Sequence, residues 1–152
     1  MCILIDTCAF AAVFKSTDSS HKDFYPVYEW IKDGPGKILY GGTKYREELK
    51  PFLSIVSEFS KARKTIHLSD EVVDQEEKAV KQLETDPDFD DPHLVAILRI
   101  SKAILVCTKE KRAIKFLKKK ALYPKKQALP KIYASKKNQK LLNSKNIPPK
   151  FL

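Results

Sequence analysis

The chain has 152 residues, of which 43% are hydrophobic and 10% aromatic. This length is typical of one domain, and the composition excludes wholesale disorder. No apolar run approaches the roughly 20 residues that a membrane-spanning helix needs. The first residues lack the basic segment of a secretory signal peptide and reach an acid at Asp6, so we expect no such signal. Three cysteines, Cys2, Cys8 and Cys107, form no even framework, so we expect reduced thiols and a cytoplasmic protein. Because no apolar run is long enough to span a bilayer, we also expect no membrane partner.

Charge is divided unevenly along the chain. The whole sequence has 29 Lys and Arg against 19 Asp and Glu, a net charge of +10. Residues 1–97 hold 12 basic and 18 acidic side chains, whereas residues 98–152 hold 17 basic side chains and one acid, Glu110. This basic third predicts an anionic partner, most simply nucleic acid. An acidic membrane surface and a merely solubilising lysine surface are the alternatives.

Strand-like and helix-like segments alternate through the first half of the chain. In order, we expect a strand over 2–6, a helix over 7–14, a polar loop over 16–23, a helix over 25–32, a strand over 37–40, a helical stretch over 45–64 and a strand over 65–68. The first strand is a continuous apolar run closed by a carboxylate, which is typical of a buried parallel strand. We expect the helical stretch to bend near Pro51, because proline has no amide to donate inside a helix.

The alternation continues to about residue 120. We expect a helix over 70–84 with Ser69 as its N-cap, an acidic loop over 85–90, a helix over 91–102, a strand over 103–107 and a basic helix over 110–120. Strands separated by helices predict an α/β fold of three layers, α/β/α, with a central parallel sheet. Residues 1–120 are the predicted domain.

The segment from 121 to 152 has a different composition. It carries four prolines, eight lysines and no acid, yet apolar residues are spread through it. We expect a lysine-rich C-terminal extension packed on the domain, with a short strand over 131–133 and a short helix over 136–143.

Acidic residues stand at four places where this pattern puts a site. They are Asp6 at the end of the first strand, Glu47 or Glu48 after the second, Asp90 or Asp91 before the helix that leads to the fourth, and Glu110 just after the fourth. Ligands of open parallel sheets bind outside the carboxyl ends of the strands, so these acids can converge. Clustered carboxylates repel one another, and Mg²⁺ or Mn²⁺ compensates them well with oxygen ligands. The chemistry implied is phosphodiester hydrolysis. It requires no histidine, and the three histidines of the chain show no ligand spacing.

Four short segments carry a family resemblance. They are Ile-Leu-Ile-Asp-Thr at 3–7, Tyr-Arg-Glu-Glu-Leu at 45–49, Asp-Pro-His-Leu-Val-Ala at 91–96 and Leu-Val-Cys-Thr-Lys-Glu at 105–110. Over residues 2–117 the chain resembles the PIN-domain ribonucleases. The family pattern selects Glu48 over Glu47 and Asp91 over Asp90. The chain departs from that pattern at Cys8, where the family often has Asn, and at Glu110, where it usually has Asp.

The resemblance implies a PIN-like fold and a metal-dependent endoribonuclease that prefers single-stranded RNA. Its Mg²⁺ or Mn²⁺ would be held by Asp6, Glu48, Asp91 and Glu110, which would also be the catalytic residues. Many relatives are toxin halves of toxin–antitoxin pairs and form homodimers, which implies an antitoxin protein and a second copy as partners.

Other residues near these acids are candidates for supporting roles. Thr7 and Thr108 could hydrogen-bond the acids or a metal-bound water, or could be ordinary caps at strand ends. Lys109, Lys111 and Arg112 could hold the RNA backbone through charge and counterion release. The alternative function is a catalytically weak or inactive PIN-like module that binds RNA or a protein through its basic third.

Overall fold

The strands of the protein form one parallel sheet. The computed structural model describes residues 2–146. The strands are β1 (Cys2–Ile5), β2 (Lys37–Gly41), β3 (Thr65–Leu68), β4 (Leu105–Cys107) and β5 (Lys131–Tyr133). Their order across the sheet is β3-β2-β1-β4-β5, and every pairing is parallel. The predicted α/β class with a central parallel sheet is therefore confirmed.

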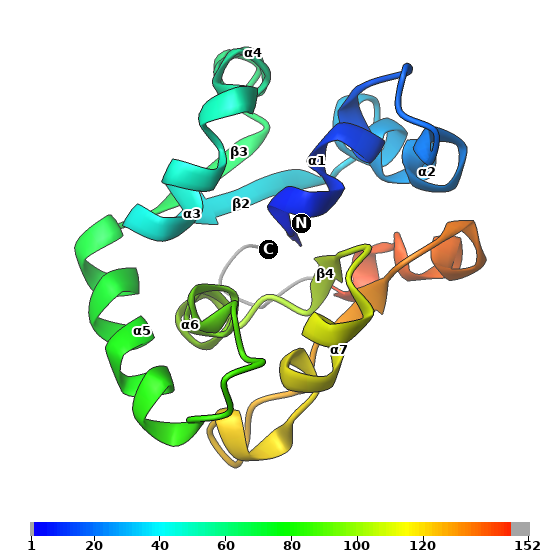
Figure 1. The fold of residues 1–152 in the computed structure, drawn as a ribbon. Coiled ribbons are helices and arrows are strands. Elements are labelled where there is room, and N and C mark those ends of the chain that lie inside the picture. Colours follow the sequence, from blue (N-terminus) through cyan, green and yellow to red (C-terminus); the bar gives the residue numbers. More distant parts are fainter. Residues whose placement is uncertain (1, 147–152) are drawn as a thin grey trace.

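Helices cover both faces of this sheet. They are α1 (Thr7–Phe14), α2 (His21–Lys32), α3 (Thr43–Glu48), α4 (Leu53–Lys61), α5 (Asp70–Leu83), α6 (Pro92–Ser101) and α7 (Lys111–Leu117). Short 3₁₀ turns are η1 (Lys50–Phe52), η2 (Lys120–Leu122), η3 (Lys136–Leu141) and η4 (Ser144–Asn146). Figure 1 shows α1, α2 and α4 on one side of the sheet and α5, α6 and α7 on the other. No helix between residues 2 and 146 is long and apolar enough to cross a membrane.

The middle of the core is β1. All four of its side chains are fully buried, as are those of its neighbour β4. Because β1 lies between two strands and two helical layers, both of its faces exclude water, and its sequence is apolar throughout rather than alternating. The chain runs from β1 out to β3 and then returns to β4 on the other side of β1. Such a reversal leaves a crevice at the carboxyl ends of the two strands, which is where open α/β sheets bind ligands.

The second helix begins earlier than predicted. We expected a polar loop through Asp23, but α2 begins at His21. The His21 Nδ1 lies 2.8 Å from the carbonyl oxygen of Ala12 in α1, and the His21 ring packs against Tyr25 with the centroids 5.4 Å apart. This contact between α1 and α2 orders residues that look loop-like in isolation.

The predicted helical stretch over 45–64 is broken as expected. It divides into α3, η1 and α4, with Pro51 inside the 3₁₀ turn. It also begins two residues early, because Asp74 of α5 accepts hydrogen bonds from both the amide and the hydroxyl of Thr43 (2.9 and 2.6 Å). The first turn of α3 is therefore capped by another helix rather than by its own sequence.

Smaller differences lie at other element ends. The helix expected from residue 91 begins at Pro92, and Lys102 ends it in a left-handed conformation with φ of 57°. The strand expected from 103 begins at Leu105, and the basic helix ends at Leu117 rather than at 120. Ser69 stands at the predicted N-cap of α5, but its side chain makes no capping hydrogen bond.

The predicted extension contributes to the sheet itself. The expected strand over 131–133 is β5, which pairs with β4. Tyr133 is fully buried and donates its hydroxyl proton to the carbonyl oxygen of Asp23 in α2 (2.8 Å). The expected helix over 136–143 is the shorter 3₁₀ turn η3, capped by Ser135 and Asn138. Residues 147–152 of the predicted extension lie outside the described residues.

Candidate metal and catalytic site

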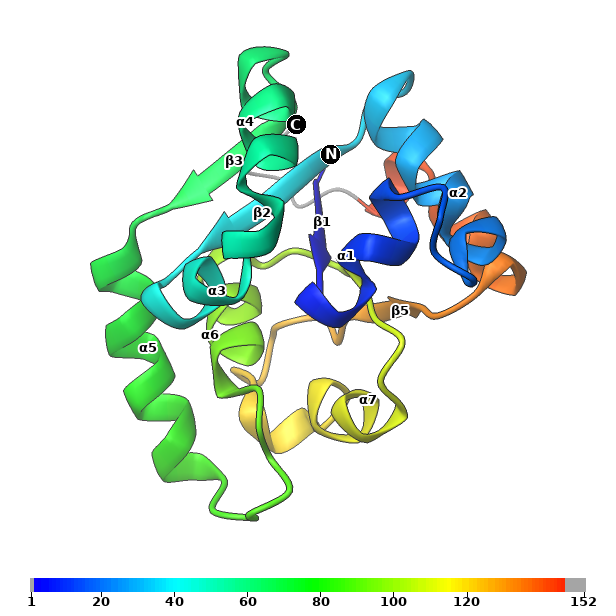
Figure 2. The same cartoon turned by 45° about the horizontal axis from the view of Figure 1, so that its top comes forward.

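Asp6 directly follows β1, the central strand. Figure 2 shows the carboxyl end of β1 among α3, α6 and α7. Its amide donates to the Cys107 carbonyl oxygen of β4 (2.8 Å), which ties the ends of the two strands together. The Asp6 residue is only 5% exposed. One carboxylate oxygen accepts a hydrogen bond from the Thr108 hydroxyl (2.8 Å), and the other caps α1 through the Cys8 amide (3.5 Å). Asp6 is thus both a helix cap and a carboxylate held at the crevice.

Glu48 reaches the same crevice from the last turn of α3. The Thr7 hydroxyl donates to its Oε2 (3.3 Å), and the His93 Nε2 lies 2.8 Å from its Oε1. The contact with His93 is the largest effect holding the pKa of Glu48 below its usual range, with smaller help from Lys44 and Thr7 against the opposing effect of burial. Glu48 is therefore a carboxylate whose Oε2 accepts a hydrogen bond from Thr7, whereas its buried Oε1 lies close to His93 without a hydrogen bond to any residue between 2 and 146.

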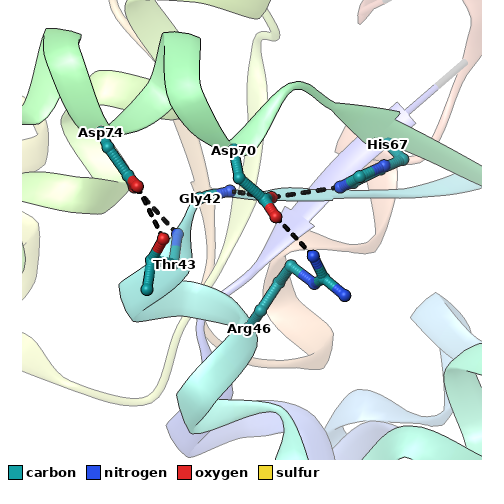
Figure 3. A network of polar contacts seen from close by, with 6 residues as sticks. All are labelled: Gly42, Thr43, Arg46, His67, Asp70 and Asp74. Atoms are coloured by element: carbon teal, nitrogen blue, oxygen red, sulfur yellow. Dashed lines mark hydrogen bonds and ion pairs between the residues drawn. The ribbon is translucent and has the colours of Figure 1, made fainter.

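A polar network fixes the helix that carries Glu48. We call it the Asp70 network; it consists of Gly42, Thr43, Arg46, His67, Asp70 and Asp74 (Figure 3). Asp70 accepts from the Gly42 amide (3.0 Å), lies 3.2 Å from the His67 Nε2 and pairs with Arg46. A glycine is required at position 42, because its φ is +88° and a Cβ there would meet Val73 at 2.5 Å. These contacts join the start of α3 to α5, so the position of Glu48 depends on them.

Asp91 and Glu110 come from the other side of the crevice. Asp91 directly precedes α6 and Glu110 directly precedes α7, and neither side chain caps its own helix. Both residues line one small cavity, together with Phe89 and Phe116. The two side chains therefore do not cap α6 and α7, although their positions in the sequence would allow it. Both residues border the same small cavity instead.

The four predicted acids form a carboxylate cluster, a name used below for Asp6, Glu48, Asp91 and Glu110. Ligand atoms of Asp6, Cys8 and Glu110 lie within 4.8 Å of one another, and so do ligand atoms of Glu48, Asp91 and His93. Burial, followed by the charge of Asp6, raises the pKa of Asp91 to about 6; His93 opposes this, and Glu110 and Glu48 add to it. The mutual repulsion expected of clustered carboxylates is therefore felt at Asp91.

The structure also separates the neighbouring acids that the sequence alone leaves open. Glu47 is exposed, whereas Glu48 lies in the cluster. Asp90 is exposed and lies 3.6 Å from Arg112, whereas Asp91 lies in the cluster. Asp90 also lines the small cavity beside Asp91 and Glu110, but only Glu48 and Asp91 of the two pairs have ligand atoms close to those of other possible ligands.

Two residues of this site were not among the predicted site residues. His93 lies beside Glu48 and Asp91, and the Asp-x-His spacing from 91 to 93 is a signal that could have found it. Cys8 lies 3.7 Å from the Thr108 hydroxyl oxygen. Burial, followed by the charge of Asp6, raises the pKa of the Cys8 thiol to about 11, so this thiol is protonated at neutral pH and is no nucleophile here.

The predicted RNA-binding residues lie on the surface beside Glu110. Lys109, Lys111 and Arg112 are all exposed. Arg112 lies within 3.6–3.9 Å of acidic side chains at 88, 90 and 110, which partly neutralise it. Lys109 and Lys111 form no ion pair with any residue in the described part of the chain. The two lysines are therefore better placed to meet a phosphate than Arg112.

The donor set of the crevice suits a hard divalent cation. Four carboxylates supply oxygen ligands, which Mg²⁺ and Mn²⁺ prefer, and a cation would relieve the repulsion felt at Asp91. Asp6, Glu48, Asp91 and Glu110 would hold the ion. No protein-family model, no curated protein and no solved structure matches this chain. The function proposed below therefore rests on the contacts and chemistry of these residues.

Proposed function

We propose that this chain is a Mg²⁺- or Mn²⁺-dependent endoribonuclease of PIN type that cleaves phosphodiester bonds in single-stranded RNA. The observation that carries the proposal is the carboxylate cluster. Ligand atoms of the four acids form two close groups, Asp6 with Glu110 and Glu48 with Asp91, and the charges of the other three acids help to raise the pKa of Asp91. Such a cluster costs stability unless it serves a cation, so a metal site is its best explanation.

Each residue has a definite part in this activity. A divalent ion in such a site polarises a phosphodiester and activates water for attack. Asp6 and Glu48 are held for this purpose by the hydroxyls of Thr108 and Thr7. Lys109 and Lys111 attract the RNA backbone beside Glu110 and place the scissile phosphate at the cluster. We also propose an antitoxin protein and a second copy of this chain as its partners, as the family resemblance implies.

The test is cleavage of a mixed single-stranded RNA pool in Mg²⁺, in Mn²⁺ and in EDTA. We expect cleavage that needs the metal and that falls at least about 100-fold in Asp6→Asn and in Glu48→Gln. Glu47→Gln is the matched control, since it removes the neighbouring exposed acid, and it should cleave like the wild type. Wild-type cleavage by Asp6→Asn, or in EDTA, would overturn the assignment.

A second candidate function is an inactive PIN-like module that binds RNA. The observation that favours it is the concentration of 17 basic side chains and one acid in residues 98–152. Such a module would retain RNA without cutting it, in the wild type and in Asp6→Asn alike. Retention should weaken as salt rises, because phosphate contacts release counterions. Charge reversal at Lys125, Lys126, Lys136 and Lys137 should then abolish retention.

A further inference from the structure

Phe89 is an aromatic residue beside the carboxylate cluster that none of the roles above requires. It lies in the loop between α5 and α6, two residues before Asp91, and is half-buried. Its ring stacks on that of Phe116 in α7, with the centroids 4.8 Å apart and the planes 29° from parallel. Both residues line the small cavity that Asp91 and Glu110 border. An aromatic pair therefore lies next to two of the proposed metal ligands.

Solvent reaches this pair through Phe89. Phe116 is only 2% exposed, whereas Phe89 is half-buried. Because Phe116 covers one face of the Phe89 ring, the accessible part of the pair belongs to the side of Phe89 that points away from Phe116. A ring that is backed by a second ring is a firm apolar surface, and offset stacking lets another flat ring add to it.

Several contacts hold the loop that carries Phe89. The Phe89 amide donates to the carbonyl oxygen of Asp86 (3.0 Å), and the Asp88 amide donates to the Asp86 carboxylate (2.9 Å). Arg112 of α7 lies 3.9 Å from Asp88 and 3.6 Å from Asp90. The residues on both sides of Phe89 are thus paired with α7. A ring that is already held in place loses little conformational entropy when a ligand binds to it.

The charge of this loop decides which part of an RNA it can meet. Residues 85–91 carry four acids and no basic side chain, so they repel a phosphate,. A nucleobase has no such charge and can lie on an aromatic ring. Lys109 and Lys111 are exposed on either side of Glu110 and supply the cations for phosphates,. Proteins that bind single strands combine these two features, a basic surface for the backbone and aromatic rings for the bases.

We propose that Phe89 stacks on an unpaired base of the RNA, next to the phosphate that lies at the carboxylate cluster; this inference rests on the proposed function. Phe89 and Asp91 are two residues apart, so their Cα atoms lie within about 7 Å of each other. A base inside a duplex is paired and stacked on both faces, so only an unpaired base can offer a face to this ring. Phe89 is thus a determinant of the preference for single strands.

The test measures RNA binding by the full chain in EDTA, where no cleavage is expected. Fluorescence anisotropy compares two labelled probes, a short single-stranded RNA of mixed sequence and an abasic oligomer with the same number of phosphates. Phe89→Leu, which keeps an apolar side chain but has no ring, should bind the RNA at least about fivefold more weakly than the wild type. It should bind the abasic oligomer as the wild type does. Phe89→Tyr, which keeps the ring, should bind both probes within about twofold of the wild type.

Two controls separate stacking from charge and from loss of any exposed ring. Tyr25→Leu removes an exposed ring on α2, which lies on the other side of the sheet from α7, and it should bind both probes like the wild type. Lys109→Gln should weaken binding of both probes and lower the salt dependence of binding, whereas Phe89→Leu should leave the salt dependence unchanged. Far-ultraviolet circular dichroism checks that each variant is folded.

Several results would overturn the stacking role. Wild-type RNA affinity in Phe89→Leu would remove it, and so would equal losses for the RNA and the abasic oligomer, because Phe89 would then only support the loop. Cleavage of the RNA pool by the wild type is measured separately. A chain that cleaves the pool but shows no base-dependent loss in Phe89→Leu keeps the proposed function and loses the stacking role. A chain that neither binds nor cleaves RNA loses both.

Discussion

Two groups of acidic side chains lie at neighbouring strand ends of this sheet, the carboxylate cluster beside β1 and β4 and the Asp70 network beside β2 and β3. In the network, each acid has partners: Asp70 pairs with Arg46 and His67, and Asp74 accepts from Thr43. In the cluster, the charges of Asp6, Glu110 and Glu48 all act on Asp91, although Glu48 also contacts His93 and Glu110 lies 3.6 Å from Arg112. The two groups thus differ most at Asp70, which basic side chains surround, and at Asp91, which lies among other acids.

The pKa values of Asp70 and Asp91 shift in opposite directions, whereas that of Glu48 in the cluster, which lies beside His93, is lowered like that of Asp70. Burial raises the pKa of Asp70, but hydrogen bonds from Arg46, His67 and the Gly42 amide outweigh it and hold that pKa below its usual range. Burial raises the pKa of Asp91 to about 6, and the charge of Asp6 reinforces it. The network therefore stabilises the folded chain as it stands, whereas the cluster gains most from a bound cation. The difference separates an acid with basic partners from an acid whose proposed role is to bind a metal ion.

The largest effect is expected when one acid of the cluster is replaced, and the matched control replaces the acid next to it in the sequence. Asp91→Asn should lower the RNA cleavage rate by about 100-fold or more, because a metal-binding carboxylate becomes a neutral amide. Asp90→Asn should cleave within about threefold of the wild type, because it removes only an exposed ion pair with Arg112. Single-turnover cleavage at matched metal concentration measures both. Equal losses in the two variants would mean that general negative charge, rather than the cluster, supports the reaction.

Metal binding should stabilise the chain through the cluster alone. At a Mn²⁺ concentration about 100 times its dissociation constant, the free energy of unfolding should rise by about 2.7 kcal/mol. For a chain of this size, that corresponds to a rise of about 5–10 °C in Tm. Asp70→Asn should show the same rise and Asp6→Asn almost none, in thermal melts at constant ionic strength. A similar rise in the Asp6 variant would place the metal elsewhere.

Without metal, the cluster should make stability depend on pH. Asp91 is protonated in the folded state below about pH 6 but ionised in the unfolded state above about pH 4,. The folded state therefore binds more protons between these values, and the free energy of unfolding falls as pH rises through this window. Above it, Asp91→Asn should be more stable than the wild type by about 1–2 kcal/mol, allowing for solvent screening. Urea titrations in EDTA at pH 4.5 and 7.5 test this. A variant that is less stable at pH 7.5 would contradict it.

The smallest effect is expected in the Asp70 network. Asp70→Asn should destabilise the chain by about 1 kcal/mol, because its ion pair with Arg46 is lost and its remaining bonds weaken. RNA cleavage should stay within about threefold of the wild type. Urea unfolding and the cleavage assay measure the two quantities on one sample. A loss of cleavage as large as that of Asp91→Asn would erase the distinction between the two groups.

Much of the fold could be predicted because its signals are local. The apolar run of β1, the break at Pro51 and the strand at residues 131–133 are visible in short stretches of sequence, and the structure confirms them. The start of α2 could not be predicted, because it depends on a contact between His21 and Ala12 in another helix. The early start of α3 likewise depends on Asp74, which lies 31 residues away.

The candidate site divides in the same manner. Its four acids could be named because each stands at a strand or helix end, and Asp6, Glu48 and Asp91 also match short family patterns from which Glu110 departs only in having Glu for Asp. The choice between Glu47 and Glu48 rests in the sequence on that resemblance alone, whereas in the structure one residue is exposed and the other is not. The Asp-x-His spacing brings His93 near Asp91 in the sequence, but its contact with Glu48, at 2.8 Å and 45 positions earlier in the chain, is visible only in the structure.

By itself, the sequence determined the alternation of elements, the placement of acids at strand ends and the basic character of the last third, since each follows from the order of residue types. Only the tertiary structure decided which acids share a crevice, which acids pair with basic side chains and which ring nitrogen of His93 lies beside Glu48. The physical reason is distance. Charge repulsion, hydrogen bonding and burial act over a few ångströms between atoms, and only the folded chain brings residues from separate segments that close.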